Sequence, residues 1–320
     1  MSPHCTEGRL KAVLPALARP LIEPHLPEGL DIVWFASRTE AESAIADADI
    51  AWVDLQSSTD SAQVVAQGRH LKWAFTLRAG IDAFDTDTLR ANGTILTNGT
   101  GINALAVAEY AVMGMLVAAK RYDAVVRLAD KHEWTTSAPG QVELCGTKAL
   151  IVGMGTIGTL IAERIAAFGV EVTGVTRSGR DGTLKPDQWR EKLHEFDWIV
   201  LAAPSTDATQ TMIGADELAA MKPSAWIINI ARGDMIDQGA LIAALKARKL
   251  AGAFLDPTDP EPLPADHPLW DAPNALITMH LSGRSQTTMF QRATKLFLEN
   301  LDAFVNGREM RNVVDLDAGY

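Results

Sequence analysis

Three residues in the second half of this sequence have side chains of the types that together can reduce a ketone. They are Arg232, Glu261 and His280. A protonated imidazole can neutralise the alkoxide that forms when hydride reaches a carbonyl carbon, and a nearby carboxylate favours the charged imidazole. A guanidinium can hold a substrate carboxylate through two hydrogen bonds while it polarises the keto oxygen. Taken singly, each residue has a common structural explanation, so the inference depends on their positions.

Each of the three residues comes just after a run that is predicted to be a buried strand. In chain order these runs are Trp226–Ile230, Gly252–Leu255 and Ala275–Met279. In open α/β sheets, ligands bind beyond the carboxyl ends of the strands. The positions therefore predict that the three side chains serve one site, where a 2-keto acid and a 2-hydroxy acid are interconverted.

A glycine-rich run joins the strand predicted over Ala149–Val152 to a helical pattern. It places Gly153, Gly155 and Gly158 in the spacing GxGxxG, which is informative here because a strand precedes it and a helix follows. The glycines permit a tight turn, backbone approach to a pyrophosphate and close helix–strand packing. N–H groups at the helix start can then bind phosphate, and the first helical residues are Thr156 and Ile157. The alternative is an ordinary turn that happens to contain glycines.

The residues after the next predicted strand, Glu171–Val175, bear on the choice between NAD and NADP. An NAD site usually has Asp or Glu there to bind the ribose 2′-hydroxyl. Here no carboxylate occurs before Asp181, and the intervening side chains include Thr176, Arg177, Ser178 and Arg180. Arg and Ser side chains can bind a 2′-phosphate. We therefore expect NADP to be preferred, with NAD possible; if the two arginines are only solvated loop charges, discrimination would be poor.

Short β-rich runs alternate with helical segments along most of the chain, which is typical of parallel α/β sheets. Before residue 98 the predicted strands are Leu30–Phe35, Ile50–Asp54, Lys72–Thr76 and Thr94–Thr97. Helices are predicted over Glu40–Ala48 and Ala62–Gly68, with Thr39 and Ser61 as their N-caps. After a glycine-rich turn at residues 98–101, further elements are predicted over Ala104–Ala129 (helix), Trp198–Ala202 (strand) and Thr287–Val305 (helix).

These elements predict an α/β fold with two Rossmann-like or flavodoxin-like parallel-sheet domains. Residues 1–100 with 285–320 are expected to form one domain, because the last helix has no strand after it and should fold back onto the first unit. Residues 101–284 are expected to form the dinucleotide-binding domain.

Composition narrows the class of protein. The net charge of −11 and pI of about 5.1 disfavour nucleic-acid binding. Two cysteines, Cys5 and Cys145, make neither a disulfide scaffold nor a metal site, which fits a reduced, cytoplasmic protein. No signal peptide is visible at the N-terminus, and the apolar run Ala104–Ala119 is too short to span a membrane.

From about Leu71 onward the sequence resembles the D-isomer-specific 2-hydroxyacid dehydrogenase family, which includes glyoxylate/hydroxypyruvate reductases and phosphoglycerate dehydrogenases. Besides the glycine run, the resemblance rests on segments that begin at Arg78 (RAGID), Ala106 (AVAE), Glu217 (ELAAMKP), Asn229 (NIARGD), Glu261 (EPLPADHPLW), His280 (HLSG) and Asn312 (NVVD).

The resemblance implies a substrate domain built from both chain ends, a coenzyme domain between two hinges, a cleft that closes on a small 2-keto acid, and a homodimer. It matches the family's catalytic Arg, Glu and His to Arg232, Glu261 and His280, and its carboxylate-binding turn to Ala79 and Gly80. Further cofactor contacts are expected at Ala203, Pro204, Ile230, Ala231, Asp256 and Gly283. Related alternatives are a formate or amino-acid dehydrogenase, and an NAD(P)H-sensing regulatory protein with little turnover.

Three positions depart from the family pattern. Met279 stands where the family commonly has Pro before the catalytic His, and Pro257 stands where a β-branched residue is usual. Arg78 replaces a small residue. Arg78, together with Arg284, could favour a substrate with a second anionic group; the alternative is a surface pairing of Arg78 with Asp82 or Asp85.

Overall fold

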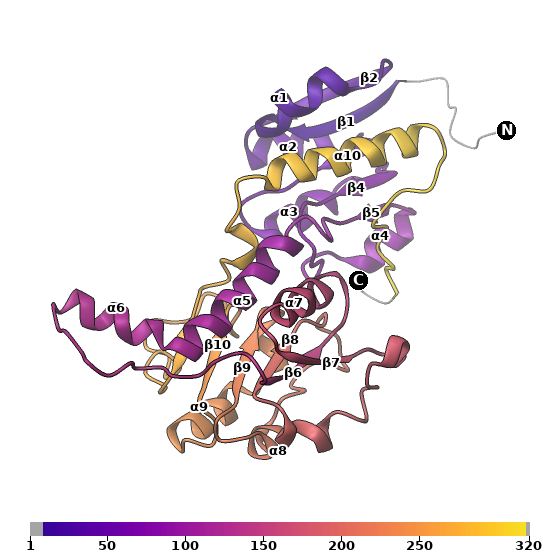
Figure 1. Ribbon diagram of the computed structural model, residues 1–320. Helices are drawn as coiled ribbons and strands as arrows, with labels where there is room; N and C mark the ends of the chain where they lie inside the picture. The colour runs from indigo at the N-terminus through magenta and orange to yellow at the C-terminus, as the bar shows by residue number, and fades with distance from the viewer. Residues whose placement is uncertain (1–8, 318–320) are drawn as a thin grey trace. The chain divides into compact units, whose positions relative to one another are not determined.

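A computed structural model describes residues 9–317, so Cys5 and the N-terminal segment in which no signal peptide is visible lie outside the described residues. The chain divides into two compact units (Figure 1). One contains the residues up to Asn103 and those from Gln286 onward, and the other is Ala104–Ser285. The first division lies after Asn103, three residues beyond the predicted boundary after residue 100. The second lies after Ser285, one residue beyond the predicted boundary after residue 284.

The first unit is built on a five-stranded parallel sheet in the order β2-β1-β3-β4-β5. The strands are β1 (Leu10–Pro15), β2 (Leu30–Phe35), β3 (Ile50–Trp52), β4 (Trp73–Phe75) and β5 (Ile95–Thr97). The last four agree with the predicted strands, whereas β1 was not predicted. A short apolar run cannot be assigned from periodicity alone, and β1 is defined by pairing with both β2 and β3.

Helices cover both faces of this sheet. They are α1 (Arg19–Ile22), α2 (Arg38–Ile45), α3 (Ser58–Val65), α4 (Thr86–Asn92) and α10 (Met289–Val305), with short 3-10 turns η1 (Ala16–Ala18) and η2 (Glu23–His25). The predicted N-caps Thr39 and Ser61 are wrong. Ser37 and Ser57 have extended backbone and accept hydrogen bonds from the N–H groups of the third helical residues, so both helices begin earlier.

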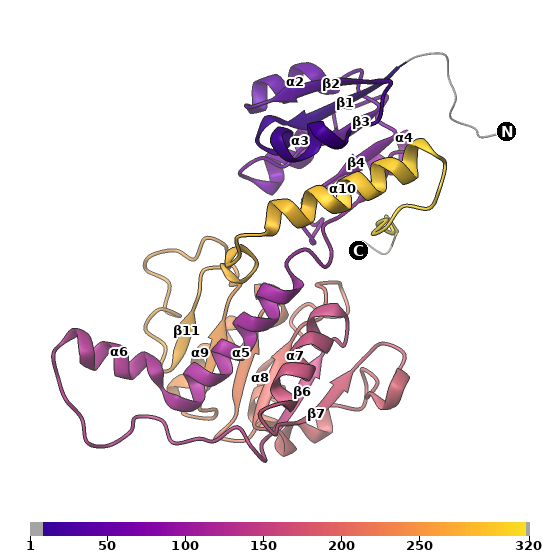
Figure 2. The same ribbon diagram turned by 45° about the horizontal axis from the view of Figure 1, so that its top comes forward.

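Helix α10 brings the end of the chain onto the first unit, as predicted (Figures 1 and 2). Its buried face includes Phe297, which stacks on Trp73 with ring centroids 5.1 Å apart and lies 5.2 Å from the ring of Trp52. Large aromatic surfaces contribute strongly to core stability. The last helix therefore completes the core on one face of the sheet, while α2, α3 and α4 supply the other.

The second unit has a six-stranded, all-parallel sheet in the order β11-β10-β9-β8-β6-β7. Its strands are β6 (Lys148–Val152), β7 (Glu171–Val175), β8 (Trp198–Leu201), β9 (Trp226–Asn229), β10 (Gly252–Leu255) and β11 (Ala275–Ile277). All six were predicted, and the doubly wound fold is confirmed. The strand order reverses between β6 and β8, and a crevice at such a reversal is the usual ligand position in this architecture.

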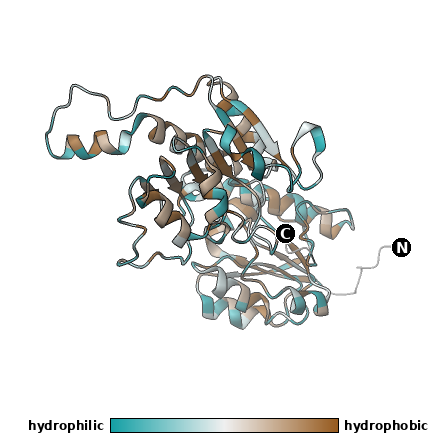
Figure 3. Ribbon diagram, turned by 90° about the horizontal axis from the view of Figure 1, so that it is seen from below, coloured by the Kyte–Doolittle hydropathy of each residue, from teal (hydrophilic) through white to brown (hydrophobic). Residues whose placement is uncertain are grey.

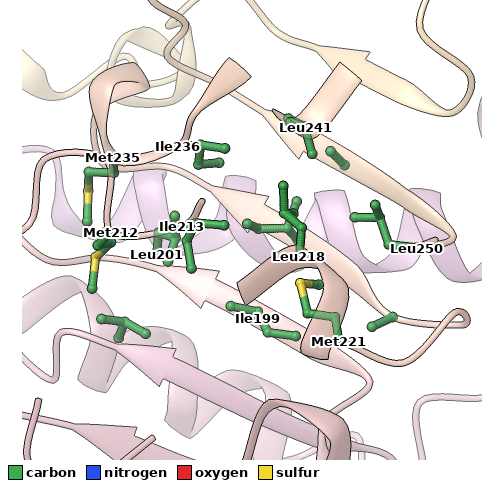
Figure 4. Close-up of a cluster of buried hydrophobic side chains, with 14 of the residues drawn as sticks. Ile199, Leu201, Met212, Ile213, Leu218, Met221, Met235, Ile236, Leu241 and Leu250 are labelled. Carbon is green, nitrogen blue, oxygen red and sulfur yellow. The ribbon is translucent and has the colours of Figure 1, made fainter. Parts of the chain in front are cut away.

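Alternate residues of these strands point into two cores. One lies under α8 (Ala215–Ala220), α9 (Gln238–Lys246) and the 3-10 segment η4 (Arg190–Glu195), and Figure 4 shows its Leu, Ile and Met side chains packed against β8. The other lies under α5 (Ala104–Lys120) and α7 (Thr156–Ala166). Figure 3 shows hydrophobic residues concentrated in the strands and hydrophilic ones on the outer helix faces. Such a two-sided sheet requires near-continuous apolar strands.

The single helix predicted over Ala104–Ala129 is wrong, because the structure breaks it at Arg121. That residue has φ 47°, which ends α5 and starts α6 (Tyr122–Asp130) in a new direction. Helix α5 is extensively buried, whereas no residue of α6 is buried. Within residues 9–317, no helix is long and apolar enough to cross a membrane.

Candidate active site

The glycine loop after β6 is shaped by backbone contacts that a side chain would obstruct. Gly153 has φ +103°, and a Cβ there would lie 2.5 Å from the backbone nitrogen of Ala203, in the loop after β8. A Cβ on Gly158 would collide with the carbonyl oxygen of Gly153. Gly153 and Met154 donate backbone hydrogen bonds to Val175 at the end of β7. These contacts draw the loop ends of β6, β7 and β8 together.

The start of α7 is suited to a phosphate group. A Cβ on Gly155 would meet nothing within 4 Å, so open space lies beside this backbone. Gly155 is the N-cap of an 11-residue helix and supplies no side-chain cap for its first N–H groups. Those N–H groups, including the ones of Thr156 and Ile157, are therefore uncapped by a side chain, and both they and the helix dipole favour a negative charge beside the helix start. The predicted cofactor residues fit a dinucleotide at this position.

The loop after β7 is closed on itself by hydrogen bonds. The Thr176 hydroxyl lies 2.7 Å from the Thr183 hydroxyl and accepts a hydrogen bond from the Gly179 N–H. Arg177, Ser178 and Arg180 are exposed on this loop. Arg180 is also 4.0 Å from the carboxylate of Asp181, which is the first acidic residue after the strand. The loop thus presents two guanidinium groups at the carboxyl end of β7, while its single acidic group is next to one of them.

The predicted cofactor residues after β8 and β9 lie in two loops that contact each other. Ala203 packs on Gly153, and Pro204 follows it. Ser205 then donates a hydrogen bond of 2.7 Å to the carboxylate of Asp234, in the short turn η5 (Gly233–Met235) after β9. Sequence reasoning missed this pair because Ser and Asp are common in loops and nothing in their spacing links them.

Arg232 is held at the end of β9 by a buried amide. The side chain of Asn229 donates to the Arg232 carbonyl at 2.8 Å and accepts from the Ala231 N–H at 3.0 Å. Arg232 also donates through Nη1 to the Ala231 carbonyl. A Cβ on Gly233 would collide with backbone at Thr258, so this glycine lets the Arg232 turn approach the loop after β10. Asn229 was missed as a positioning residue; its signal was an amide in an otherwise apolar strand.

Glu261 and His280 form a direct pair, as their positions after neighbouring strands predicted. Both carboxylate oxygens of Glu261 lie 3.0 Å from Nδ1 of His280. A carboxylate can only accept hydrogen bonds, so Nδ1 carries the proton in this pair. The Nε2 atom is the imidazole nitrogen that does not contact Glu261. Both side chains are roughly two-fifths exposed, as residues that meet a ligand should be.

The surroundings of Glu261 favour its charged form. Burial raises the pKa of the Glu261 carboxyl, but the hydrogen bond and charge of His280, the Thr258 N–H and the charge of Arg232 together outweigh burial. The net result is a pKa below the ordinary value. The three predicted catalytic residues thus interact electrostatically at the carboxyl ends of β9, β10 and β11.

The backbone that carries His280 is strained. Met279 has φ 56° and His280 has φ 54°, a left-handed conformation that is unusual for residues with a Cβ. Proline is restricted to φ near −65°, so this turn could not form with the Pro that the family commonly has at position 279. The departure at Met279 therefore has a structural reason.

Asp256 fixes this strained turn. Its buried carboxylate accepts hydrogen bonds from the Thr278 hydroxyl at 2.7 Å, the Leu281 N–H at 2.9 Å and the Ser282 N–H at 3.2 Å. Its carbonyl also accepts from the His280 N–H. With no exposed surface, Asp256 contacts protein in this structure, and its expected contact with the nicotinamide stays a prediction. The same holds for Gly283, in the turn η6 (Ser282–Arg284).

The predicted substrate-binding turn lies in the first unit, after β4. The Arg78 carbonyl accepts from the Gly99 N–H and the Ala79 carbonyl from the Asn98 side chain, both at 2.8 Å. In a trans peptide the N–H points opposite to the carbonyl. The N–H groups of Ala79 and Gly80 therefore point away from the loop after β5, and neither has a hydrogen-bond partner among residues 9–317. Consecutive N–H groups on one side of a turn make an anion-binding concavity.

Arg78 does not form the expected surface pairing. Its Nε is 3.7 Å from the carboxylate of Asp54, and Nη2 donates to the carbonyls of Leu55 and Gln56. Asp85, one of the two expected partners, instead caps α4 by accepting from Thr88. The guanidinium is thus bound by the loop after β3, which sequence reasoning could not foresee.

Comparisons with known proteins agree with this architecture. A model of the NAD-binding domain of D-isomer specific 2-hydroxyacid dehydrogenases matches residues 112–282. An uncharacterized protein of the proB 3′ region in Corynebacterium melassecola is 33% identical over 93% of this chain and 98% of its own length. Glyoxylate/hydroxypyruvate reductase B of Pectobacterium carotovorum is 31% identical over 77% of this chain and 79% of its own.

A solved structure is similar over nearly the whole chain. A D-isomer specific 2-hydroxyacid dehydrogenase family protein from Aeromonas salmonicida has a TM-score of 0.87 at 29% identity, covering 97% of this chain and 100% of that one. The chain belongs to the D-isomer specific 2-hydroxyacid dehydrogenases, a family of NAD(P)-dependent oxidoreductases.

We expect Glu261→Gln to remove a pH-dependent contribution to stability. The pKa of Glu261 is lower in the folded protein than in the unfolded chain, so the carboxylate stabilises the fold above its ordinary pKa, and this contribution is lost as pH falls through the lowered value. In thermal unfolding, the Tm advantage of the wild type over Glu261→Gln should shrink as the pH drops below about 4.3. The exposed Glu195→Gln is the control, and a Tm difference that does not vary with pH would contradict the prediction.

Proposed function

We propose that this protein reduces a small 2-keto acid of the glyoxylate or hydroxypyruvate type to the D-2-hydroxy acid, with NADPH as the preferred hydride donor. The observation that carries the proposal is the pairing of His280 with Glu261 beside Arg232, downstream of a glycine loop fit for a diphosphate. The substrate type is supported by the Pectobacterium relative, whose name is glyoxylate/hydroxypyruvate reductase.

The roles of the residues follow from their geometry. A bound nicotinamide coenzyme supplies the hydride. His280, whose Nδ1 proton is directed to Glu261, gives a proton from Nε2 to the keto oxygen as negative charge develops there, which completes the hydroxyl group. Glu261 stabilises the protonated imidazole, and Arg232 binds the substrate carboxylate and polarises the carbonyl. The free N–H groups of Ala79 and Gly80 are further donors for the carboxylate.

The preference for NADPH is supported by the charges of the loop after β7. A 2′-phosphate at this strand end would meet Arg177 and Arg180 as cations and Ser178 as a hydroxyl donor. Asp181 is highly exposed and next to Arg180, so it is a poor substitute for the carboxylate that binds a ribose 2′-hydroxyl in NAD sites.

We place the enzyme in the cytoplasm, because the exposed Cys145 is a free thiol and thiols persist in a reducing compartment.

We also propose that two copies of the chain form a homodimer through α5, α6 and the segment after them. A groove of about 480 Å³ runs beside α5, lined by Val112, Met113, Leu116 and Tyr122. Trp134 is 94% exposed, and none of the residues of α6 is buried. Exposed apolar surface of this extent is unusual for a monomer, and charges of both signs nearby allow the surface to complement a second copy of itself.

We expect His280→Ala to lower kcat/KM for 2-keto acids by about 100-fold to 10,000-fold, because general acid catalysis is lost. NADPH binding, measured by quenching of tryptophan fluorescence, should be unchanged. His194→Ala, an exposed histidine of η4 in the same unit, serves as the control and should behave like wild type. Near-normal turnover of His280→Ala would overturn the assignment, and negligible turnover by the wild type would favour a sensing protein.

We expect Arg177→Ala to raise KM for NADPH by about tenfold, since one charge-assisted hydrogen bond to the 2′-phosphate is lost. KM for NADH should not change. Arg248→Ala removes an exposed charge before β10, at the amino end of the sheet, and should alter neither constant. Equal effects of Arg177→Ala on both coenzymes would show that this loop does not select NADP.

We expect Trp134→Ser to shift the protein from a dimer toward the 34.5 kDa monomer. Since Trp134 is almost fully exposed within one chain, its removal should not destabilise the monomer. Molar mass can be followed by light scattering over a dilution series, with Leu17→Ser, also exposed but in the first unit, as the control. A wild type that is monomeric throughout the series would refute the dimer.

A further inference from the structure

A buried carboxylate lies beneath the predicted carboxylate-binding turn of the first unit. Asp54 follows β3, and its side chain is only 7% exposed. It accepts hydrogen bonds from the Trp52 indole at 2.8 Å, the Thr76 hydroxyl at 2.8 Å and the Leu77 N–H at 2.6 Å. Burial raises the pKa of the Asp54 carboxyl despite these donors and the charge of Arg78. A carboxylate this buried is costly unless it is well bonded, so its partners are tightly constrained.

Thr76 connects this carboxylate to the turn. It comes directly after β4 and is fully buried. Its hydroxyl donates to Asp54 and accepts from the Arg78 N–H at 3.2 Å. The hydroxyl therefore joins the loop after β3 to the backbone that leads into Ala79.

The guanidinium of Arg78 strengthens the same connection. Nε lies near the Asp54 carboxylate, and Nη2 bonds the carbonyls of Leu55 at 2.9 Å and Gln56 at 3.2 Å. From the opposite side, Asn98 and Gly99 bond the carbonyls of Ala79 and Arg78. The turn is thus held by hydrogen bonds from two neighbouring loops. Its free N–H groups, those of Ala79 and Gly80, both point away from the loop after β5.

The second unit contains the same arrangement under its catalytic turn. There Asp256 follows β10 and accepts from the hydroxyl of Thr278, which comes directly after the neighbouring strand β11. In the first unit Asp54 follows β3 and accepts from Thr76, directly after the neighbouring strand β4. In both cases the carboxylate also accepts a hydrogen bond from a backbone N–H that follows the threonine, that of Leu77 in the first unit and that of Leu281 in the second.

We propose that Asp54, Thr76 and Arg78 are positioning residues that orient the N–H groups of Ala79 and Gly80 for the substrate carboxylate. The inference rests on the proposed function, because it assumes that a 2-keto acid is the substrate. Arg78 acts here through its contacts with the loop after β3, so it does not bind a second anionic group on the substrate. The three residues set KM for the keto acid and take no part in the hydride and proton transfers.

The sharpest test is Thr76→Val, which keeps the shape of the buried side chain and removes its hydroxyl. Two hydrogen bonds are lost, and KM for glyoxylate and hydroxypyruvate should rise about threefold to tenfold, the effect of roughly one net hydrogen bond. The rate constant kcat and KM for NADPH should be unchanged, and Thr76→Ser should restore KM. Thr94→Val is the matched control, since Thr94 is also buried but donates to the Leu71 carbonyl at the amino end of β5. It should lower Tm and leave KM unchanged.

Arg78→Ala provides an independent readout. The clamp that Asp54, Thr76 and Arg78 are proposed to form on the turn requires KM to rise by the same factor for monocarboxylic and dicarboxylic keto acids. A selective loss of dicarboxylic substrates would overturn the proposal in favour of recognition of a second anion, and an unchanged KM in both Thr76→Val and Arg78→Ala would also overturn it. Failure of the wild type to reduce any keto acid would count against the proposed function, whereas an active wild type with unaffected variants would count only against the clamp.

Discussion

The hydrogen bonds of the Asp256 carboxylate hold the turn that carries His280 in place, and the pairing of His280 with Glu261 depends on them. His280 lies in a turn where two successive residues adopt left-handed backbone. Such a conformation persists only where the surrounding structure fixes it. Asp256 supplies that constraint through one hydroxyl and two N–H groups of the turn, and the charged hydrogen bonds are strong because the carboxylate is buried. The imidazole then meets Glu261 with Nδ1, and in the proposed function Nε2 exchanges the proton with the substrate.

Glycines allow the other loops to approach this edge of the sheet. Gly153 and Gly158 shape the turn between β6 and α7, and Gly233 lets the Arg232 turn pack on the loop that leads to Glu261. At each of these positions backbone atoms occupy the place of a Cβ, so the requirement for glycine is steric. Arg232, Glu261 and His280 are separated in the chain, but they come together because parallel strands end at one edge and their loops pack without side chains between them.

The two units solve the same physical problem in the same way. In the proposed function one turn presents donors to an anion and the other presents an imidazole to a ketone, so each needs a defined backbone without regular secondary structure. In each unit an aspartate after one strand binds a threonine hydroxyl and a backbone N–H after the next. A buried carboxylate tolerates few alternative arrangements, since an unmet hydrogen bond there is costly. The aspartate–threonine pair in each unit therefore ties the two loops to the ends of their strands and makes them rigid.

Much of the molecule was determined by sequence patterns that act over short distances. Apolar runs predicted all six strands of the second unit, the glycine spacing predicted the tight turn between β6 and α7, and the positions after strands predicted the pairing of Glu261 with His280. The helix break at Arg121, the caps at Ser37 and Ser57 and the strand β1 were decided by competition between local propensity and packing, which periodicity does not resolve. The link from Arg78 to Asp54, the hold of Asn229 on Arg232 and the left-handed turn at His280 were decided only by tertiary structure. These depend on hydrogen bonds between loops whose proximity is created by strand order, and no local pattern encodes that order.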